Sequence, residues 1–307
     1  MSNVTTSKGV AAHGTVYVGA PVLDAQRNNT LFMIYGRGNS RGGMTPFVTA
    51  STDAGASWSA PRSSGLCTTG NAVANPGPGA GLQLASGRLV VPVQTSNCAG
   101  SNDTTHAGAM YSDDHGGPKI ASPPSLCLGM FCTEASHASA AGVTWKQSSP
   151  VVGPGETQLA LTSHGTLLTI GHGDRKTERY QMFAESADGG VSWGAVRRAS
   201  DLVNVGSQQS MVSATEADGR HFLYYAASHG LLLGLDEFDE VTSRRDGVVK
   251  YSQDDGKTWW LLEPAVLRAG PFMYSGIVRR GGNLSHVTLG FVFEGFAGDC
   301  PRPSRGG

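Results

Sequence analysis

Residues 186–193 read SADGGVSW, and this stretch decides the fold because it recurs along the chain. STDAGASW at 51–58 and SQDDGKTW at 252–259 follow the same pattern, S-x-D-x-G-x-[S/T]-W, and an interrupted copy, SDDHGG, begins at Ser112. The four copies start 61, 74 and 66 residues apart, a spacing typical of successive four-stranded propeller blades. The repeats therefore predict one β-propeller domain over residues 1–307, not two unrelated domains.

Each copy has the composition of a tight turn between two strands. The acidic residue can accept hydrogen bonds from backbone N–H groups, and the glycine tolerates a positive φ. A tryptophan ends each complete copy and is expected to pack beneath the turn. These positions are Asp53, Gly55 and Trp58; Asp188, Gly190 and Trp193; and Asp254, Gly256 and Trp259. We interpret these boxes as structural elements and assign them no chemistry.

Composition and patterning agree with an all-β chain. Hydrophobic residues make up 39% of the chain and charged residues 15%, and 43 of the 307 residues are glycine, which favours short strands and tight turns over helices. Apolar runs rich in β-branched and aromatic residues predict individual strands. These runs are RLVVPV from Arg88, TLLTIGHG from Thr166, YQMFAES from Tyr180, HFLYYAAS from His221 and VTLGFVFE from Val287.

The charge of the chain argues against some partners. A net charge of -1 provides no broad basic field for nucleic acid or an anionic membrane. The N-terminus lacks the apolar core of a signal peptide, and no apolar run is long enough to span a membrane, so we expect a soluble chain without a transmembrane segment. Four N-x-S/T sequons would matter only in a secretory route, so lysosomal, secreted and cytoplasmic locations all stay open. The sequons are at Asn3, Asn28, Asn102 and Asn283.

The interrupted box is separated from its VTW ending by a predicted loop insertion at about 118–142. Cys127 and Cys132 lie in this insertion, and we expect them to be unpaired loop residues. The five cysteines have irregular spacings that match neither a paired metal-ligand pattern nor a dense disulfide framework. No phosphate-binding or dinucleotide motif occurs either, so the sequence implies no cofactor and no metal.

Longer segments around the boxes resemble those of sialidases, also called neuraminidases. GPGAGLQLASGRLVVP at 77–92, followed by YSDDHGG, is similar to the stretch before the second Asp box of exo-α-sialidases. In the segment GETQLALTSHGTLLTIGHGDRK, Glu156 matches the glutamate that activates the family's tyrosine nucleophile. Arg175 lies 19 residues later, in the place of an arginine that binds the substrate carboxylate. The resemblance implies a six-bladed β-propeller of four-stranded antiparallel sheets that acts on terminal sialic acid.

Two segments near the end of the chain extend the resemblance. In SRRDGVVKYSQDDGKTW, Arg244 resembles another arginine of the family's substrate-binding triad, and Arg245 is an adjacent candidate. In FMYSGIVRRGGNLSHVTLGFVFEG, Tyr274 matches the nucleophile and Glu294 the glutamate that orients the first arginine of the triad. The matched segments follow the family's order over nearly the whole chain.

The chemistry of sialic acid explains this choice of residues. Its carboxylate sits on the anomeric carbon and would repel an anionic nucleophile, whereas the neutral phenol of Tyr274 can approach. A phenol has a reference pKa of about 10, so a base such as Glu156 must take its proton. The guanidinium groups of Arg175 and Arg244 can hold the substrate carboxylate by charge-assisted hydrogen bonds. His172, near Arg175, is interpreted as structural or solvent-facing.

The first repeat departs from the family. Gly19, in VYVGAPVL, stands where the first triad arginine is expected, and Gly43 lies close to the place of the acid/base aspartate. Arg37, in IYGRG, does match a further arginine that contacts the sugar ring, and Arg41 is a candidate to compensate in part. Loss of a general acid typically lowers a rate by about 10²–10⁴-fold. Activity is therefore expected to be impaired, or restricted to substrates with good leaving groups.

Three functions follow from these observations. The first is an exo-α-sialidase that releases terminal sialic acid from glycoproteins, gangliosides or oligosaccharides. The second is a catalytically impaired propeller that binds sialylated glycans without turnover. The third is a propeller scaffold that kept only the boxes, and it leaves the joint occurrence of Glu156, Arg175 and Tyr274 unexplained.

Overall fold

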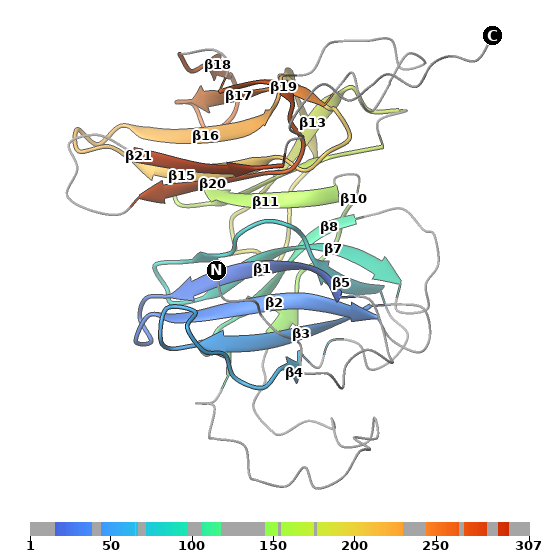
Figure 1. Cartoon of the computed structure of the whole chain (residues 1–307), viewed down its shortest axis with the longest axis vertical. Coiled ribbons are helices and arrows are strands. Elements are labelled where there is room, and N and C mark those ends of the chain that lie inside the picture. The colour runs from blue at the N-terminus through green and yellow to red at the C-terminus, as the bar shows by residue number, and fades with distance from the viewer. Residues whose placement is uncertain are drawn as a thin grey trace, which may run out of the picture. The chain divides into compact units, whose positions relative to one another are not determined.

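The regular structure of the protein is entirely β-sheet among the residues described by the computed structural model (Figure 1). These are residues 16–38, 44–64, 66, 72–97, 106–117, 145–152, 155–174, 177–229, 244–263, 267–280 and 288–294. Within these ranges there is no helix of the length and apolarity that crossing a membrane requires. The chain divides into two compact units, and we describe each by itself; a single domain over residues 1–307 stays a prediction. The first unit comprises residues 1–152 and 186–193, and the second 153–185 and 194–307.

The first unit contains two antiparallel sheets. The strands of the first sheet pair in chain order and are β1 (Val16–Asp24), β2 (Thr30–Gly38), β3 (Met44–Ser51) and β4 (Arg62–Ser63). The strands of the second sheet are β5 (Ala72–Pro76), β6 (Leu82–Gln83), β7 (Leu89–Asn97), β8 (His106–Ser112), β9 (Trp145–Gln147) and β10 (Val151–Val152). In this sheet β5 and β6 both pair with β7, while β9 and β10 both pair with β8. The second sheet is therefore a four-stranded blade whose outer strands are each broken in two.

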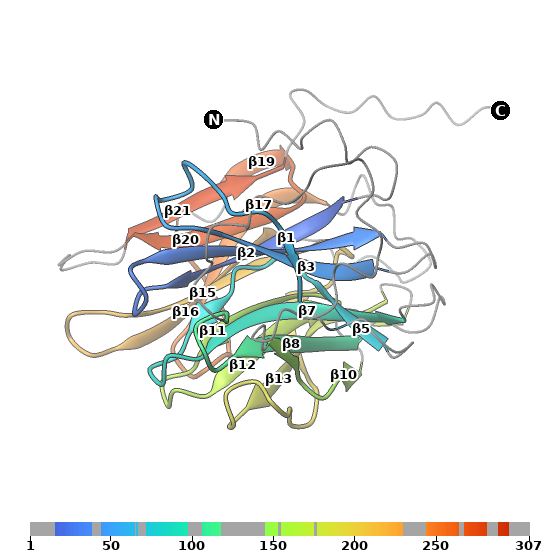
Figure 2. The ribbon, with the colours of Figure 1, turned by 90° about the horizontal axis from the view of Figure 1, so that it is seen from below.

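The strands of the second unit form three antiparallel sheets. The first contains β11 (Gly155–Leu161), β12 (Leu167–His172), β13 (Tyr180–Ser186) and β14 (Arg197–Val203), again in chain order. The next contains β15 (Ser210–Thr215), β16 (His221–Ser228), β17 (Arg245–Ser252), β18 (Trp260–Leu261) and β19 (Arg268–Pro271), with β18 and β19 both paired to β17. The last sheet is the pair β20 (Ser275–Arg280) and β21 (Thr288–Phe293), which run side by side in both views (Figure 1, Figure 2).

Each of the four larger sheets is associated with one box. The boxes connect β3 to β4, β8 to β9, β13 to β14 and β17 to β18, so each leads from the third strand of a sheet to the fourth. The interrupted copy ends at Trp145, which pairs with Ser112 across β8 and β9. The prediction of six four-stranded blades is wrong for the described residues, which form four such sheets and one two-stranded sheet. The number six came from the family resemblance, whereas four boxes mark four sheets.

The boxes have the turn geometry that their composition predicts. In the copy at 186–193, the Asp188 carboxylate accepts hydrogen bonds from the backbone N–H of Ser192 at 2.9 Å and from its hydroxyl at 2.5 Å. Gly190 has φ +86° and donates its N–H to the Ser186 hydroxyl at 2.8 Å. The copies at 51–58 and 252–259 repeat this pattern, and in the interrupted copy Gly116 likewise donates its N–H to the Ser112 hydroxyl. The tryptophans differ, because Trp259 is buried whereas Trp193 is half-buried. The boxes are thus confirmed as structural turns.

Because the carboxylates of these turns are hydrogen-bonded, we expect the protein to lose stability in acid. Hydrogen bonds from Ser57 lower the pKa of Asp53 to about 2, and those from Ser192 lower the pKa of Asp188 further. Because the pKa values in the folded protein lie below the unfolded value near 4, this contribution is present above pH ~4 and is lost as the pH falls. We expect the urea midpoint to decrease between about pH 4 and pH 2. The decrease should be smaller in Asp188→Asn than in the wild type or in the control Glu263→Gln. An equal decrease of the midpoint with pH in all three proteins would contradict this account.

Each unit has its own apolar core. In the first unit, Val22, Ile34 and Val91 belong to one buried cluster, and the ring of Phe32 lies edge-on to Trp145 at a centroid distance of 6.4 Å. In the second unit, one of two buried clusters centres on aromatic side chains, and Trp259 lies 6.0 Å from Phe183 and 5.7 Å from Tyr225 between ring centroids. Burial of such rings is the main favourable contribution to folding.

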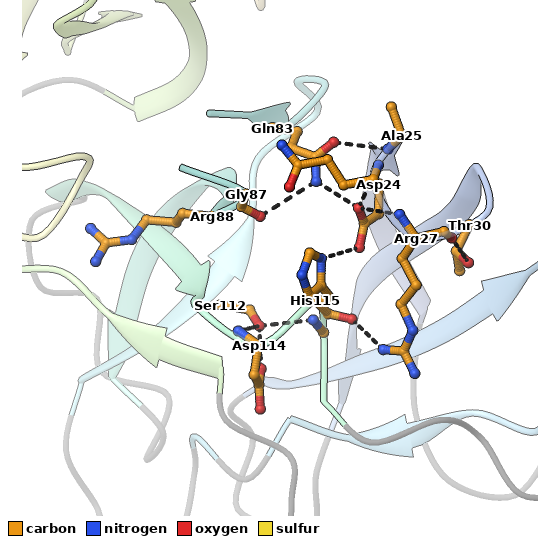
Figure 3. A network of polar contacts seen from close by, with 12 residues as sticks. Asp24, Ala25, Arg27, Thr30, Gln83, Gly87, Arg88, Ser112, Asp114 and His115 are labelled. Carbon is orange, nitrogen blue, oxygen red and sulfur yellow. Dashed lines mark hydrogen bonds and ion pairs between the residues drawn. The ribbon is translucent and has the colours of Figure 1, made fainter. Parts of the chain in front are cut away.

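A buried carboxylate ties the turn after β1 to the interrupted box. The Asp24 side chain is 0% exposed, and Figure 3 shows its carboxylate at the centre of a polar network. It accepts hydrogen bonds from the Gln83 amide at 2.6 Å, from the His115 ring at 2.9 Å and from the backbone N–H groups of Gln26 and Arg27. Since four donors satisfy this buried charge, Asp24 fixes the turn and the box together.

Several predicted features lie outside the described residues. These are the insertion at about 118–142 and all five cysteines, at Cys67, Cys98, Cys127, Cys132 and Cys300.

Candidate active site

Glu156 lies at an irregularity in the second unit. It is the second residue of β11, where the register against β12 shifts between Gly155, opposite His172, and Gln158, opposite Ile170. Its φ is +45°, a left-handed conformation that is unfavourable for a residue with a side chain. Bulges and strained backbones are common at functional sites because they redirect a side chain. Glu156 is one of seven non-glycine residues with a positive φ among the described residues, and it is one that also lies at a register shift.

Tyr274 meets this carboxylate. It lies directly before β20, and its hydroxyl donates a hydrogen bond to Glu156 Oε1 at 3.0 Å. Burial raises the pKa of Tyr274 to about 12, and the negative charge and hydrogen bond of Glu156 act in the same direction. The phenol is therefore neutral at physiological pH and needs a base in order to act as a nucleophile. Glu156 is hydrogen-bonded to the proton that has to be removed.

Arg244 is the second charged group beside the phenol. It precedes β17, and its positive charge opposes the rise in the Tyr274 pKa. The guanidinium donates to the backbone carbonyl of Gly206, and the Arg244 carbonyl accepts the N–H of Phe272 at 2.9 Å. The neighbouring candidate, Arg245, begins β17. The charge of Arg244 acts directly on Tyr274, which supports Arg244 as the candidate.

Glu294 holds the Tyr274 segment through its backbone. Its N–H donates to the Tyr274 carbonyl at 2.8 Å, and its carbonyl accepts the N–H of Met273 at 3.0 Å. The residue itself is exposed, and its negative charge adds a small upward contribution to the Tyr274 pKa. Its predicted contact with the first arginine of the triad stays a prediction, since Gly19 occupies that position of the sequence.

The remaining predicted residues lie in the first unit or outside the described residues. Arg37 is half-buried in β2 of the first unit, with its guanidinium carbon 5.7 Å from the centre of the Phe47 ring. A Cβ atom on Gly19 would lie 2.7 Å from Met33 Sδ and 3.1 Å from the Ile34 carbonyl, so a side chain there would require Met33 to move. Arg175, Arg41 and Gly43 lie outside the described residues.

The structure adds a supporting segment that the sequence reading missed, residues 204–210. The buried Asn204 amide donates to the Gly173 carbonyl at 3.1 Å, and its oxygen accepts the N–H of Gly206 at 2.8 Å. Gly206 in turn supplies the carbonyl that binds Arg244. One amide side chain thus connects the end of β12 to the arginine beside the phenol.

The same segment also contacts the backbone around the nucleophile and its base. The Gln208 amide accepts the N–H of Ser275 at 3.0 Å and donates to the Ser275 carbonyl at 2.9 Å, directly after Tyr274. The Gln209 amide lies 3.4 Å from the Glu156 carbonyl oxygen. The amide residues Asn204, Gln208 and Gln209 stand immediately before β15, and this grouping is a sequence signal that could have indicated the support.

Tyr274, Glu156 and Arg244 together form the arrangement of an activated nucleophile beside a cation. A neutral phenol faces a carboxylate that can take its proton, and a guanidinium lies close enough to affect the phenol electrostatically. A carboxylate at hydrogen-bonding distance from a hydroxyl is the geometry of an activated nucleophile. The adjacent cation suits an anionic substrate.

Solved structures of sialidases share this fold. The Hadza microbial sialidase Hz136 aligns with a TM-score of 0.63 and 19% identity over 86% of this chain and 48% of its own. A Trypanosoma rangeli sialidase, solved in complex with 2,3-difluorosialic acid as a covalent intermediate, aligns with a TM-score of 0.59 and 18% identity over 91% of this chain and 44% of its own. Both similarities concern the fold.

Sequence comparison agrees with the structural similarity. The chain is 27% identical over 260 residues to a sialidase of Micromonospora viridifaciens, which covers 80% of this chain. It spans only 33% of the length of that relative. A profile of the BNR repeat-like domain family matches residues 5–287. Because this match covers most of the chain, the protein belongs to the BNR repeat-like domain family, as its resemblance to sialidases with BNR repeats predicts.

Proposed function

We propose that the protein is an exo-α-sialidase that releases terminal sialic acid from glycoproteins, gangliosides or oligosaccharides. The observation that carries this proposal is the 3.0 Å hydrogen bond from the Tyr274 hydroxyl to Glu156. The similarity to named sialidases supports the same reaction class. The strained backbone of Glu156 is a third, independent support.

In the proposed reaction, the Tyr274 oxygen attacks the anomeric carbon while its proton moves to Glu156. The bond between the phenol oxygen and the sugar forms, and the glycosidic bond breaks with its electron pair on the departing oxygen. The oxygen of a water molecule then bonds to the anomeric carbon while the bond from the sugar to the phenol oxygen breaks, and the phenol oxygen takes back the proton from Glu156. The attacking water loses one proton to solvent, and the departed alkoxide takes one up from solvent. A neutral nucleophile avoids repulsion by the substrate carboxylate, and proton removal makes it reactive.

The substrate-binding roles come from the sequence resemblance. We assign the substrate carboxylate to Arg175 and Arg244, and a contact with the sugar ring to Arg37. Glu294 is assigned the orientation of a triad arginine. The position of Arg244 beside the phenol supports its role, because a bound carboxylate would then sit next to the anomeric carbon that Tyr274 attacks.

The second candidate is a sialoglycan-binding module with impaired catalysis. It is favoured by Gly19, which provides no guanidinium and is packed against Met33. The stretch RGNSRGGMTPFVTA around Gly43 contains no Asp or Glu in the sequence, and loss of a general acid removes a contribution of about 10²–10⁴-fold. Substrates whose leaving group needs no proton are therefore expected to react faster than natural glycans.

The test is to incubate the purified protein with a fluorogenic sialic acid glycoside and, separately, with sialyllactose, and to follow free sialic acid. Turnover that is lost in Tyr274→Phe and kept in the control Tyr251→Phe would support the sialidase. Binding of sialyllactose without release from either substrate would support the binding module instead. Neither binding nor release would overturn both.

A further inference from the structure

His172 makes a second contact to the carboxylate that faces the nucleophile. It is the last residue of β12, and its Nε2 lies 3.0 Å from Glu156 Oε2, while the Tyr274 hydroxyl binds Oε1. The side chains of His172 and Glu156 are 19% and 24% exposed. The three side chains therefore form a continuous chain, phenol to carboxylate to imidazole, that is mostly shielded from water.

The partners of the imidazole determine how many protons it carries. Its Nδ1 lies 3.0 Å from the carbonyl oxygen of Gly173, which can only accept, so Nδ1 must carry a hydrogen. The contact between Nε2 and Oε2 then needs one proton of its own. Without it, two lone pairs would face each other at 3.0 Å. Because Glu156 has to be a carboxylate in order to accept the Tyr274 proton, this proton belongs on Nε2.

We propose that His172 is a positioning residue for Glu156 and acts as an imidazolium paired with that carboxylate. This inference rests on the proposed function and deepens it, because the base becomes a Glu–His pair instead of a lone carboxylate. When Tyr274 attacks, its proton goes to Oε1 of Glu156, and the proton on Nε2 of His172 keeps Oε2 in place. The same Oε1 proton returns to the phenol oxygen when the intermediate is hydrolysed.

The pairing has a consequence for an anionic substrate. The imidazolium offsets the charge of Glu156, so this carboxylate repels an anionic sugar less. The strained backbone turns Glu156 toward the phenol, and the imidazolium fixes the other oxygen. Among the described residues, the charged groups beside these three side chains include Arg244 and Glu294, which act on Tyr274. They also include Glu178, which contacts Gly173 next to His172 and is paired with Arg198. The Gly173 and Glu178 carbonyls are themselves held by Asn204.

The proton on Nε2 can be tested without any turnover. Nitrogen-15 NMR of histidine-labelled protein at neutral pH reports which ring nitrogens carry a hydrogen, and His172→Gln assigns the signal. We expect His172 to carry both hydrogens in the wild type and only the Nδ1 hydrogen in Glu156→Gln, since that variant lacks the charge that holds the second. A wild-type ring with a bare Nδ1, or identical states in both proteins, would overturn the proposal.

The role in the reaction is tested by a pH profile. His172→Gln keeps a neutral N–H donor, and exchanging a charge-assisted for a neutral hydrogen bond should lower kcat by roughly tenfold with little change in KM. In the wild type, loss of the Nε2 proton should lower kcat at alkaline pH, and this decline should be absent in His172→Gln. His172→Ala should lose activity at every pH. The control is His221→Gln, whose ring binds the Leu161 carbonyl in the same unit, and it should leave the profile unchanged.

Two outcomes separate the proposals. A His172→Gln enzyme with the wild-type pH profile would overturn the role of His172 while leaving the sialidase intact. If no sialic acid is released by any variant or by the wild type, the proposed function fails, and the NMR experiment still decides the protonation of His172.

Discussion

Incubation with 2,3-difluorosialic acid should leave one glycosyl adduct on the protein, attached to Tyr274. The phenol oxygen forms the bond, Glu156 takes the proton and fluoride departs from the anomeric carbon. Fluoride needs no general acid, so the reaction bypasses the residue that the first repeat lacks. The second fluorine withdraws electrons and slows hydrolysis of the adduct, because that step also passes through a cationic sugar. Intact-mass spectrometry and peptide mapping would detect and locate the label.

Two variants sharpen this experiment. Tyr274→Phe should stay unlabelled, whereas Tyr251→Phe should be labelled like the wild type. Glu156→Gln should react more slowly by about 10²–10⁴-fold, the usual contribution of a general base. Steady-state turnover in Tyr274→Phe is expected to fall by roughly 10³-fold or more, since removal of a nucleophile abolishes the covalent route. A label on another side chain would contradict the assignment of the nucleophile.

The local structure of this protein could be read from its sequence because the signals are local. Each box satisfies its hydrogen bonds within a few residues, as in the contacts of Ser186 and Asp188, so composition alone predicts the turn. The strands predicted from Arg88, Thr166 and His221 correspond to β7, β12 and β16, and most of the side chains that the structure describes in them are buried. Apolar runs of β-branched and aromatic residues are sufficient for such strands.

The number of blades could not be read in the same way. The described structure has four sheets of four or more strands, one for each box, and the two-stranded pair β20 and β21 carries none. A count of six depended on the family resemblance and on no repeat in the chain. The break between β5 and β6, by contrast, coincides with GPGAG at 77–81, a Gly- and Pro-rich run of the kind that interrupts a strand.

Several contacts of the site could not be predicted from the sequence, because they join residues that are distant along the chain. Tyr274 and Glu156 lie 118 residues apart and were paired only through the resemblance, and the structure brings them to 3.0 Å. His172 was interpreted as structural or solvent-facing because the sequence does not show which side chains meet across a bulge. Gln208 and Asn204 act through backbone atoms of distant segments, contacts that depend on tertiary packing.

The largest effect on stability is expected at Asp24, far along the sequence from Glu156 and Tyr274. Its carboxylate is fully buried and accepts hydrogen bonds from Gln83, His115 and the turn after β1 (Figure 3). Asp24→Ala would leave these donors unsatisfied in a site that water does not reach, and should lower the free energy of unfolding by about 3–5 kcal/mol. Asp24→Asn keeps the shape but turns one acceptor into a donor, so roughly 1–3 kcal/mol is expected.

Urea unfolding followed by tryptophan fluorescence measures this loss, with Trp145 as a buried reporter in the same unit. The matched control is Asp218→Ala, whose carboxylate makes an exposed ion pair with Arg220 and should leave the midpoint unchanged because solvent screens such a pair. An Asp24→Ala midpoint equal to that of the wild type would mean that the network in Figure 3 does not hold the turn to the box. A lower midpoint with an unchanged denaturant slope would mean that it does, because the slope reports the surface exposed on unfolding, which the substitution should leave alone.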